Sequence, residues 1–274
     1  ALAPIIATEL LEVYDWPVVF MLVGAPGIII AIIMWFVIRE PLKQMAEQQD
    51  GSSAPAPELS INSVLGMFGH RNAKVAPLTL ICAMGGIFVI AALLMGYLTA
   101  PEAIGGLGLD PITAGRVFSA VGVGGCIGQF AMPALSDFIG RKLTTLVSYI
   151  LAAVFLLAFS QAGPENTTTL WVLMFFTSLF NFAALAILAG PVAAEAAPVG
   201  MIASMAGFVI FAGEFIGGGI SPIIATNLVD AYSFKAPLYF AACGLALGFV
   251  VALFLEETAP RKVALHLGKE EATP

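Results

Sequence analysis

Apolar residues fill most of the chain in long runs, and short polar stretches separate these runs. Crossing the hydrocarbon core of a membrane takes about 20 residues of α-helix at about 1.5 Å per residue. Seven runs fit this length: 17–38, 75–98, 114–136, 143–161, 170–190, 201–228 and 236–256. Residues 1–10 form a shorter apolar run that fits the end of one more helix. The pattern predicts an all-α integral membrane protein with seven full transmembrane helices and one partial helix.

The composition agrees with lipid as the surrounding solvent. Hydrophobic residues make up 59% of the chain and charged residues 11%, whereas soluble domains carry about 25% charged residues. The longest polar stretch has the composition of a linker. Its residues 58–68 fit either an amphipathic helix on the membrane surface or irregular chain. We expect four parts, namely the end of one helix bundle at 1–38, a linker at 39–74, a six-helix bundle at 75–256 and a tail at 257–274.

Basic residues are distributed unevenly between alternate connections. Nine of the 11 Lys and Arg residues fall on the side of the linker: Arg39, Lys43, Arg71, Lys74, Arg141, Lys142, Arg261, Lys262 and Lys269. Only Arg116 and Lys235 fall on the other side. Cytoplasmic loops carry the positive excess, so we expect the linker, the segment around Arg141 and the C-terminal tail to be cytoplasmic. Arg116 fits either an anchor that reaches the lipid headgroups or a group that attracts an anionic solute.

The stretch from Pro133 to Lys142 (PALSDFIGRK) sets an acid and two bases between two apolar runs. Major facilitator superfamily transporters have two six-helix halves joined by a long cytoplasmic linker. Between the second and third helices of each half they carry a cytoplasmic turn of the form G-x-x-x-D-R-x-G-R-K. The stretch here is similar, although Pro133 replaces the leading Gly and Phe138 the first Arg. The matching positions are Asp137, Gly140, Arg141 and Lys142.

The linker, the six runs after it, and a Gly-Pro-Gly run ending in Arg-Glu-Pro before it strengthen the resemblance. By it, the chain covers the end of helix five to helix twelve, and helices one to four lie outside it. The resemblance implies secondary transport of a small organic solute by alternating access, driven by protons. It further implies a monomer in the lipid bilayer of a bacterial inner membrane. The stretch Gly213 to Pro222 (GEFIGGGISP) is similar to transporters of organic anions and sugar acids, so a carboxylate is one candidate solute.

Three polar residues lie in the middle of apolar runs, where each needs a partner. Glu214 is the sharpest case, because an ionised acid at the bilayer centre costs about 3 kcal/mol or more. It fits either a proton-coupling or cavity-lining group or a protonated acid bonded to a neighbouring helix. Asn181 and Gln129 fit either substrate contacts or bonds between helices. We take Glu214, Asn181 and Gln129 as the candidate site for substrate or protons.

The turn itself predicts a gate on the cytoplasmic side. We expect Asp137 to accept hydrogen bonds from the N-terminal end of an adjacent helix, where anions are favoured. Arg141 and Lys142 would reach an acid such as Glu195, in the predicted connection 191–200, or anionic lipid. These contacts, with Gly140 in the turn, would hold the inner side closed in the outward-facing state. Glu195 fits equally well an acid of a solvated loop.

Patterns for catalysis are missing from the sequence. The two histidines, His70 and His266, lie in polar segments, and the three cysteines lie inside apolar runs without metal-ligand spacing. Neither a phosphate-binding loop nor a G-x-S-x-G turn occurs. We expect no enzyme, cofactor, metal or nucleic-acid partner. Two alternatives stay open, an efflux transporter for hydrophobic compounds and a receptor or scaffold with a transporter-like fold that moves no solute.

Overall fold

The computed structural model describes residues 3–11, 13–37 and 66–262, and within them it contains helices and no strands. The helices of four or more residues are α1 (Ala3–Leu10), α2 (Trp16–Val37), α5 (Arg71–Thr99), α6 (Pro111–Ile139), α7 (Arg141–Gln161), α8 (Thr167–Ile187), α9 (Ala193–Ala196), α10 (Ile202–Ala212), α11 (Gly219–Ala231) and α12 (Ala236–Ala252). Two 3₁₀ turns, η1 (Met67–Gly69) and η2 (Glu102–Ile104), flank α5. Two π-helical segments, η3 (Leu188–Val192) and η4 (Gly213–Gly218), continue α8 and α10.

The prediction of an all-α membrane bundle is confirmed. Six continuous helical segments are long and apolar enough to span a membrane: Trp16–Val37, Arg71–Thr99, Pro111–Ile139, Arg141–Gln161, Thr167–Ala196 and Ile202–Ala231. The predicted boundaries differ in several places, and the last predicted run, 236–256, forms a helix of only 17 residues that ends at Ala252. Most of the predicted linker, including residues 58–65 of its amphipathic part, lies outside the described residues, as do residues 263–274.

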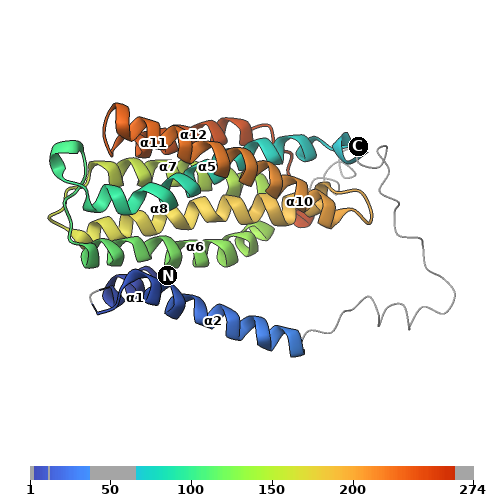
Figure 1. Cartoon of the computed structure of the whole chain (residues 1–274). Helices are drawn as coiled ribbons and strands as arrows, with labels where there is room; N and C mark the ends of the chain where they lie inside the picture. The colour runs from blue at the N-terminus through green and yellow to red at the C-terminus, as the bar shows by residue number, and fades with distance from the viewer. Residues whose placement is uncertain (1–2, 12, 38–65, 263–274) are drawn as a thin grey trace, which may run out of the picture.

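Helices α5 to α12 run alongside one another in a bundle, and α1 lies against α6 at its side (Figure 1). Helix α8 packs on both α6 and α7, while α5 packs on α12 and η4. The contact between α6 and α8 is close because Gly124 and Gly128 stand one turn apart on α6. A Cβ at either glycine would collide with the backbone of α8. Small residues at this spacing let membrane helices approach closely.

The bundle interior joins large apolar side chains with a few bonded polar groups. Leu80, Leu94, Phe159 and Met174 are almost fully buried. Tyr149 of α7 is also buried, and its hydroxyl donates to the carbonyl of Thr79 on α5 at 2.6 Å. This bond satisfies a phenol that has no access to water, which membrane interiors require. Packing and hydrogen bonding therefore fix α5, α7 and α8 as one unit.

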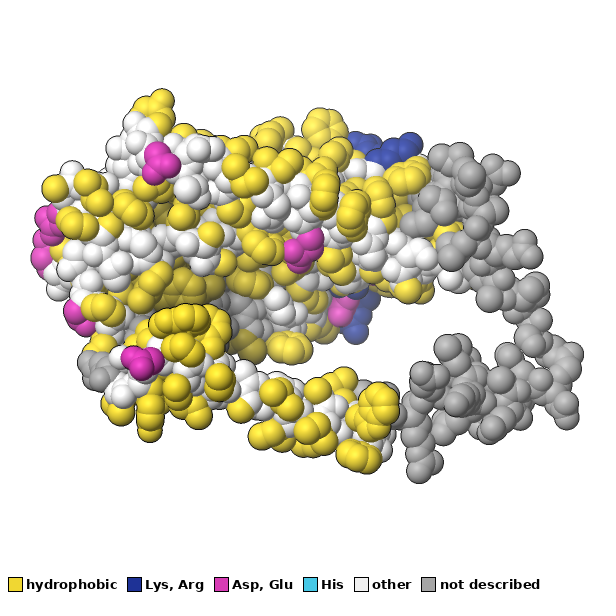
Figure 2. Space-filling view, in the orientation of Figure 1, with side chains coloured by type: hydrophobic (Ala, Val, Ile, Leu, Met, Phe, Trp, Pro, Cys, Tyr) yellow, Lys and Arg dark blue, Asp and Glu magenta, His cyan; other side chains and the backbone are white. Residues whose placement is uncertain are grey.

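The outer surface is apolar along the length of the bundle (Figure 2). Large exposed side chains occur on most of the helices, among them Phe130 at 77% and Phe215 at 66% exposure. Lys and Arg side chains gather at the end of the bundle where α10 begins (Figures 1 and 2). This distribution suits a helix bundle surrounded by lipid, with its Lys and Arg side chains at a membrane surface.

The segment predicted as one helix at 201–228 is interrupted by the π-helical η4. A π turn holds one more residue than an α turn, so the helical face shifts by about one residue across it. On η4 the glycines Gly213, Gly217 and Gly218 are buried against α5, and Glu214 is exposed. The 3.6-residue period of buried and exposed positions expected for an α-helix is therefore shifted at Glu214, which lies in the π-helical segment.

Candidate functional site

The charged stretch at residues 136–142 is a sharp corner between two helices. Helix α6 continues to Ile139, so Ser136 and Asp137 belong to its last turn and not to a loop as the sequence suggests. Gly140 alone makes the corner, with a φ of +117° that side chains other than glycine rarely tolerate. A Cβ at Gly140 would also collide with the carboxylate of Glu257. Helix α7 then begins directly at Arg141.

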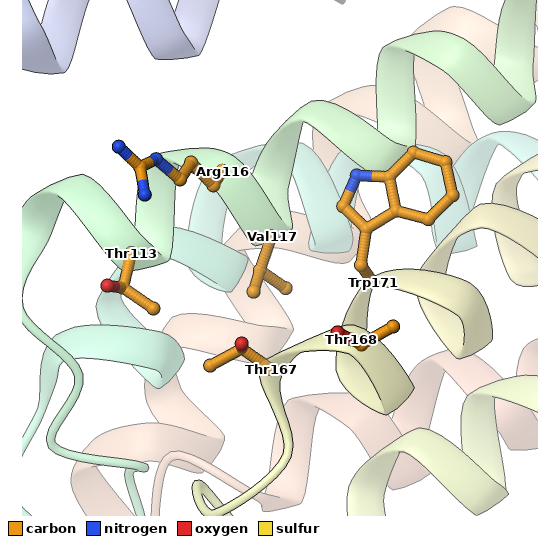
Figure 3. Close-up of a pocket in the computed structure, with 6 residues that line it drawn as sticks. All are labelled: Thr113, Arg116, Val117, Thr167, Thr168 and Trp171. Atoms are coloured by element: carbon orange, nitrogen blue, oxygen red, sulfur yellow. The ribbon is translucent and has the colours of Figure 1, made fainter.

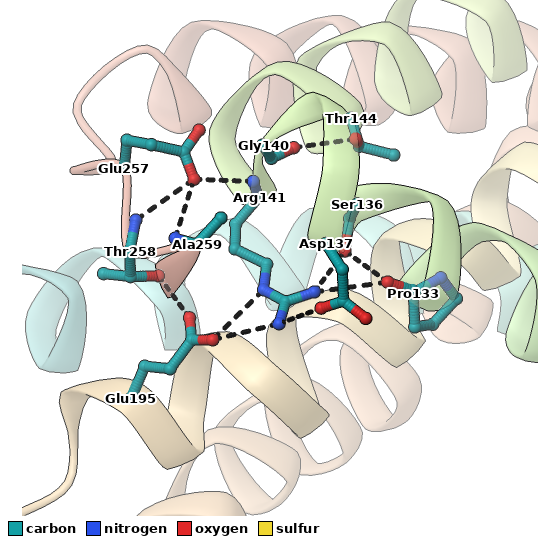
Figure 4. A network of polar contacts seen from close by, with 10 residues as sticks. All are labelled: Pro133, Ser136, Asp137, Gly140, Arg141, Thr144, Glu195, Glu257, Thr258 and Ala259. Atoms are coloured by element: carbon teal, nitrogen blue, oxygen red, sulfur yellow. Dashed lines mark hydrogen bonds and ion pairs between the residues drawn. The ribbon is translucent and has the colours of Figure 1, made fainter. Parts of the chain in front are cut away.

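The Arg141 side chain lies over the end of α6 and makes several polar contacts there (Figure 4). Its Nη1 donates to the hydroxyl of Ser136 at 2.6 Å and to the carbonyl of Pro133 at 3.2 Å. Its Nη2 lies 2.5 Å from Oδ1 of Asp137. The guanidinium therefore holds the end of α6 against the start of α7.

Glu195 provides the second carboxylate around Arg141. It lies on the short helix α9, which extends the α8 segment past the π-helical η3, and not in a loop as predicted. Its Oε1 accepts from Nε and Nη2 of Arg141 at 3.2 and 3.0 Å. Its Oε2 accepts a hydrogen bond from the hydroxyl of Thr258. The contact between Arg141 and Glu195 that we anticipated is thus present, and its role as a gate stays a prediction.

Burial makes Glu195 the more important of the two acids. The Arg141 side chain is 8% exposed, that of Glu195 21% and that of Asp137 50%. A buried guanidinium needs a partner because its desolvation is otherwise uncompensated. A half-exposed ion pair contributes little, about 0–1 kcal/mol. We therefore attribute most of the stabilisation of Arg141 to Glu195.

Glu257, which the sequence reading left inside the tail, caps the N-terminus of α7. Its Oε1 accepts from the amide of Arg141 at 2.7 Å, and its Oε2 accepts from the amide of Lys142 at 3.3 Å. The same carboxylate accepts from the amides of Thr258 and Ala259 at 3.1 and 3.0 Å. The first amides of a helix have no partner within it and favour an anion. The prediction that Asp137 fills this place is therefore wrong, because its carboxylate turns to Arg141 instead.

We call the set Pro133, Ser136, Asp137, Arg141, Glu195, Glu257 and Thr258 the Arg141 network (Figure 4). It joins α6, α7, α9 and the segment after α12. The Lys142 ammonium forms no ion pair with any residue that the structure describes. Arg261 lies nearby over the ring of Phe138, with 4.5 Å between its Cζ and the ring centroid.

A second tie fastens the segment after α12 to the start of α5. The buried Asn72 side chain donates to the carbonyl of Glu256 at 2.9 Å and accepts from its amide at 2.8 Å. Arg71 and His70 lie 3.7 and 3.9 Å from the carboxylate of Glu256. The residues after α12 are thus bonded to three other helices of the bundle, and they close one of its ends.

Residues 80–273 match the sequence model of the Major Facilitator Superfamily, and this match covers most of the chain. The chain belongs to the Major Facilitator Superfamily. It is therefore an integral multi-pass membrane protein of a transporter family and not of an enzyme family. No curated protein matches the chain.

Solved structures of this superfamily share the fold. A POT family transporter in complex with a thioalcohol-conjugated peptide is 24% identical, with a TM-score of 0.61, over 76% of this chain and 46% of that one. A POT family transporter in complex with 5-aminolevulinic acid is 22% identical, with a TM-score of 0.59, over 74% and 45%. A peptide transporter POT in complex with sulfate is 19% identical, with a TM-score of 0.60, over 67% and 37%. This chain spans less than half the length of each.

The three residues predicted to lie near the centre of the membrane, Gln129, Asn181 and Glu214, do not form one cluster in the helix bundle. Gln129 on α6 and Glu214 on η4 are exposed, whereas Asn181 on α8 is 1% exposed. Neither polar atom of the Asn181 amide has a hydrogen-bond partner, although the amide faces the bare backbone of Gly86 on α5. Among the described residues, no hydrogen bond joins any two of the three. Their roles in binding substrate or protons stay predictions.

The sequence reading missed Glu257, Thr258 and Ser136 as members of the Arg141 network. One signal was available for the first two. The last apolar run ends on the same predicted side as Arg141, and Glu256, Glu257 and Thr258 follow it directly. A search for acids near every cytoplasmic helix end would have included Glu257, and Thr258 follows it directly. No comparable signal marks Ser136, since its role depends on how the Arg141 side chain folds back over α6.

Proposed function

We propose that this chain forms the C-terminal part of a secondary transporter that moves a small organic solute by alternating access. The observation that carries the proposal is the Arg141 network, which joins the ends of α6, α7 and α9 to the segment after α12 at one end of the bundle. In alternating access, helix bundles rock around a site at the membrane midplane. All members of the network lie in the six-helix bundle or directly after α12, so it is suited to hold the ends of these helices together, and its contacts break when they separate.

The network includes three of the five residues that the sequence assigns to the gate, namely Asp137, Arg141 and Glu195. Of the other two, Gly140 forms the corner beside the network and Lys142 contributes its backbone amide. We assign this gate to the cytoplasmic side of a bacterial inner membrane, from the distribution of basic residues. Two of the solved neighbours were crystallised with a peptide conjugate and with 5-aminolevulinic acid. These ligands agree with a small organic solute, and with a carboxylate as the first class to test.

We assign proton coupling to Glu214. The π-helical η4 turns its side chain out of the six-helix packing while Gly217 and Gly218 hold the same turn against α5. An acid inside a span and free of the bundle core can exchange a proton when the conformation changes. Gln129 is exposed in the same way and is a candidate solute contact. Asn181 is buried, and would reach a solute only if α5 and α8 move apart.

The test is transport by the full-length protein in proteoliposomes. Accumulation of a radiolabelled organic acid under an imposed proton gradient is expected, and solute counterflow is expected without one. Glu214→Gln should abolish accumulation driven by protons and keep counterflow, because counterflow needs no net proton movement. Glu165→Gln serves as a matched control, because it removes an exposed acid that lies between α7 and α8 and outside the predicted spans.

Each outcome assigns a different function. Accumulation that survives Glu214→Gln would make Glu214 structural. Export of hydrophobic compounds without movement of organic acids would favour an efflux transporter. A folded protein that moves no organic solute in either direction would overturn transport and favour a receptor or scaffold.

A further inference from the structure

A separate pocket lies at the other end of the bundle from the Arg141 network. It has a volume of about 250 Å³ and lies between the first turns of α6 and α8. Its lining residues are Thr113, Arg116, Val117, Thr167, Thr168 and Trp171 (Figure 3). Arg116 and Asp137 stand 21 residues apart on the same helix, which is about 32 Å at 1.5 Å per residue. The pocket and the network therefore lie at opposite ends of the bundle, about one membrane thickness apart.

Arg116 brings an uncompensated positive charge to this pocket. Its side chain is exposed and forms no ion pair with any acid among the described residues. The other arginines within that part of the chain each have a partner. Arg71 faces Glu256, Arg141 has two carboxylates, and Arg261 lies on an aromatic ring. The acid nearest along the chain, Asp110, is engaged elsewhere.

Asp110 caps α6, and its Oδ1 accepts from the amides of Ile112 and Thr113 at 3.1 and 3.0 Å. Hydrogen bonds from Thr113 hold the pKa of this carboxyl below its ordinary value. Asp110 is therefore ionised at neutral pH and bonded to the helix terminus. Its charge is directed at the first amides of α6, which leaves the guanidinium of Arg116 as the free charge of the pocket.

The rest of the lining supplies hydroxyl groups and one fixed aromatic wall. Thr113, Thr167 and Thr168 each place a hydroxyl at the pocket. The Trp171 ring is held by a bond from its Nε1 to the hydroxyl of Ser119 at 3.2 Å and by stacking on Phe175. Arg116 and Trp171 lie on either side of Val117 (Figure 3). Thr113 lies on the same side as Arg116, and Thr168 lies beside Trp171 (Figure 3). A ligand here would meet a cation at one side, an aromatic surface at the other, and hydroxyl groups along the pocket.

We propose that this pocket binds the carboxylate or phosphate group of a small organic anion through Arg116. Guanidinium and hydroxyl donors in one pocket suit such oxyanions, and Arg pairs with them in a bidentate way. The hydroxyls of Thr167 and Thr168 bond the remaining oxygens, and Trp171 covers the apolar part of the ligand. The anion has two possible sources, a dissolved solute and the headgroup of an anionic phospholipid, since the pocket lies at a membrane surface.

The experiment measures binding and needs no transport, so it stands or fails independently of the proposed function. The full-length protein is titrated with sodium phosphate and with sodium succinate in a neutral detergent, against sodium chloride at equal ionic strength. The readouts are the thermal unfolding midpoint and tryptophan fluorescence, since Trp171 lines the pocket. The same readouts are compared in nanodiscs of phosphatidylcholine with and without phosphatidylglycerol.

Three variants assign the effect to the pocket. Arg116→Gln should weaken oxyanion binding about tenfold to a hundredfold, from the usual strength of hydrogen bonds to charged groups. Arg116→Lys keeps the charge but loses the planar guanidinium that binds oxyanions in a bidentate way. Its affinity should lie between those of the wild type and Arg116→Gln. Lys235→Gln removes the other cation predicted for this side of the membrane and lies outside the pocket, so it should bind like the wild type.

A response to phosphate or succinate that depends on Arg116 supports a dissolved anion. A response to phosphatidylglycerol alone, again dependent on Arg116, supports a lipid headgroup. The proposal is overturned if all variants respond alike to every anion, or if Lys235→Gln loses as much binding as Arg116→Gln.

Discussion

Replacing Glu195 by glutamine tests the gate at its most buried acid. The glutamine side chain has nearly the same shape and can still accept one bond from Arg141. It loses the negative charge that faces a guanidinium only 8% exposed. Hydrogen bonds to charged groups contribute about 1.5–3 kcal/mol. With Asp137 still beside Arg141, we expect a loss of about 2 kcal/mol, which changes the ratio of closed to open inner ends about thirtyfold.

The assay is a distance measurement in the full-length protein with spin labels at Val199 and Leu143. These residues lie just after α9 and at the start of α7, and they are 100% and 50% exposed, so labels should not disturb packing. Glu195→Gln should shift the distance distribution toward its longer component. Asp137→Asn is the matched control, because its half-exposed pair is expected to contribute at most about 1 kcal/mol, or fivefold.

The reasoning would be refuted by a distribution that Glu195→Gln leaves unchanged. It would also be refuted if Asp137→Asn shifted the distribution more than Glu195→Gln does, because burial would then not rank the two acids. Either variant should keep the solute preference of the wild type, since the network does not include the candidate solute contacts.

Three further variants test other features of the bundle. Glu257→Ala should lower stability by about 1 kcal/mol or more because α7 loses its N-terminal cap, whereas Glu256→Ala should cost less, since its side chain contributes only long, half-exposed ion pairs. Gly217→Ala should destabilise by about 1–3 kcal/mol through collision with the backbone of α5, and Gly207→Ala, which has open space around it, should not. Asn181→Leu should raise the thermal unfolding midpoint because a buried, unbonded amide costs about 1–3 kcal/mol, and a lower midpoint would show that the amide is bonded. Unfolding in detergent measures all of them.

The helices could be predicted because each one must span the same apolar layer. The residues at which the helices begin and end could not be predicted in the same way, because helix caps and π turns depend on contacts with neighbouring helices. The motif identified Gly140 at the corner. It did not show that α6 continues through Asp137 or that Glu257, distant in the sequence, caps α7. The π turn at Glu214 arises where three glycines pack on α5, and such packing leaves no periodic signal. Contacts between distant segments, such as Arg141 with Glu195, could be proposed from charge but their hydrogen bonds could not.

The cap of α7 has a consequence for the order in which the protein is made. The carboxylate of Glu257 and the amide of Arg141 are separated by 116 residues, and Asn72 and Glu256 by 184. A chain leaves the ribosome from its N-terminus, so α5 to α10 are inserted before the residues that close this end exist. Until the segment after α12 has been made, the N-terminus of α7 therefore lacks Glu257 as its cap. A chain stopped after α12 would contain α5 to α12 without this cap.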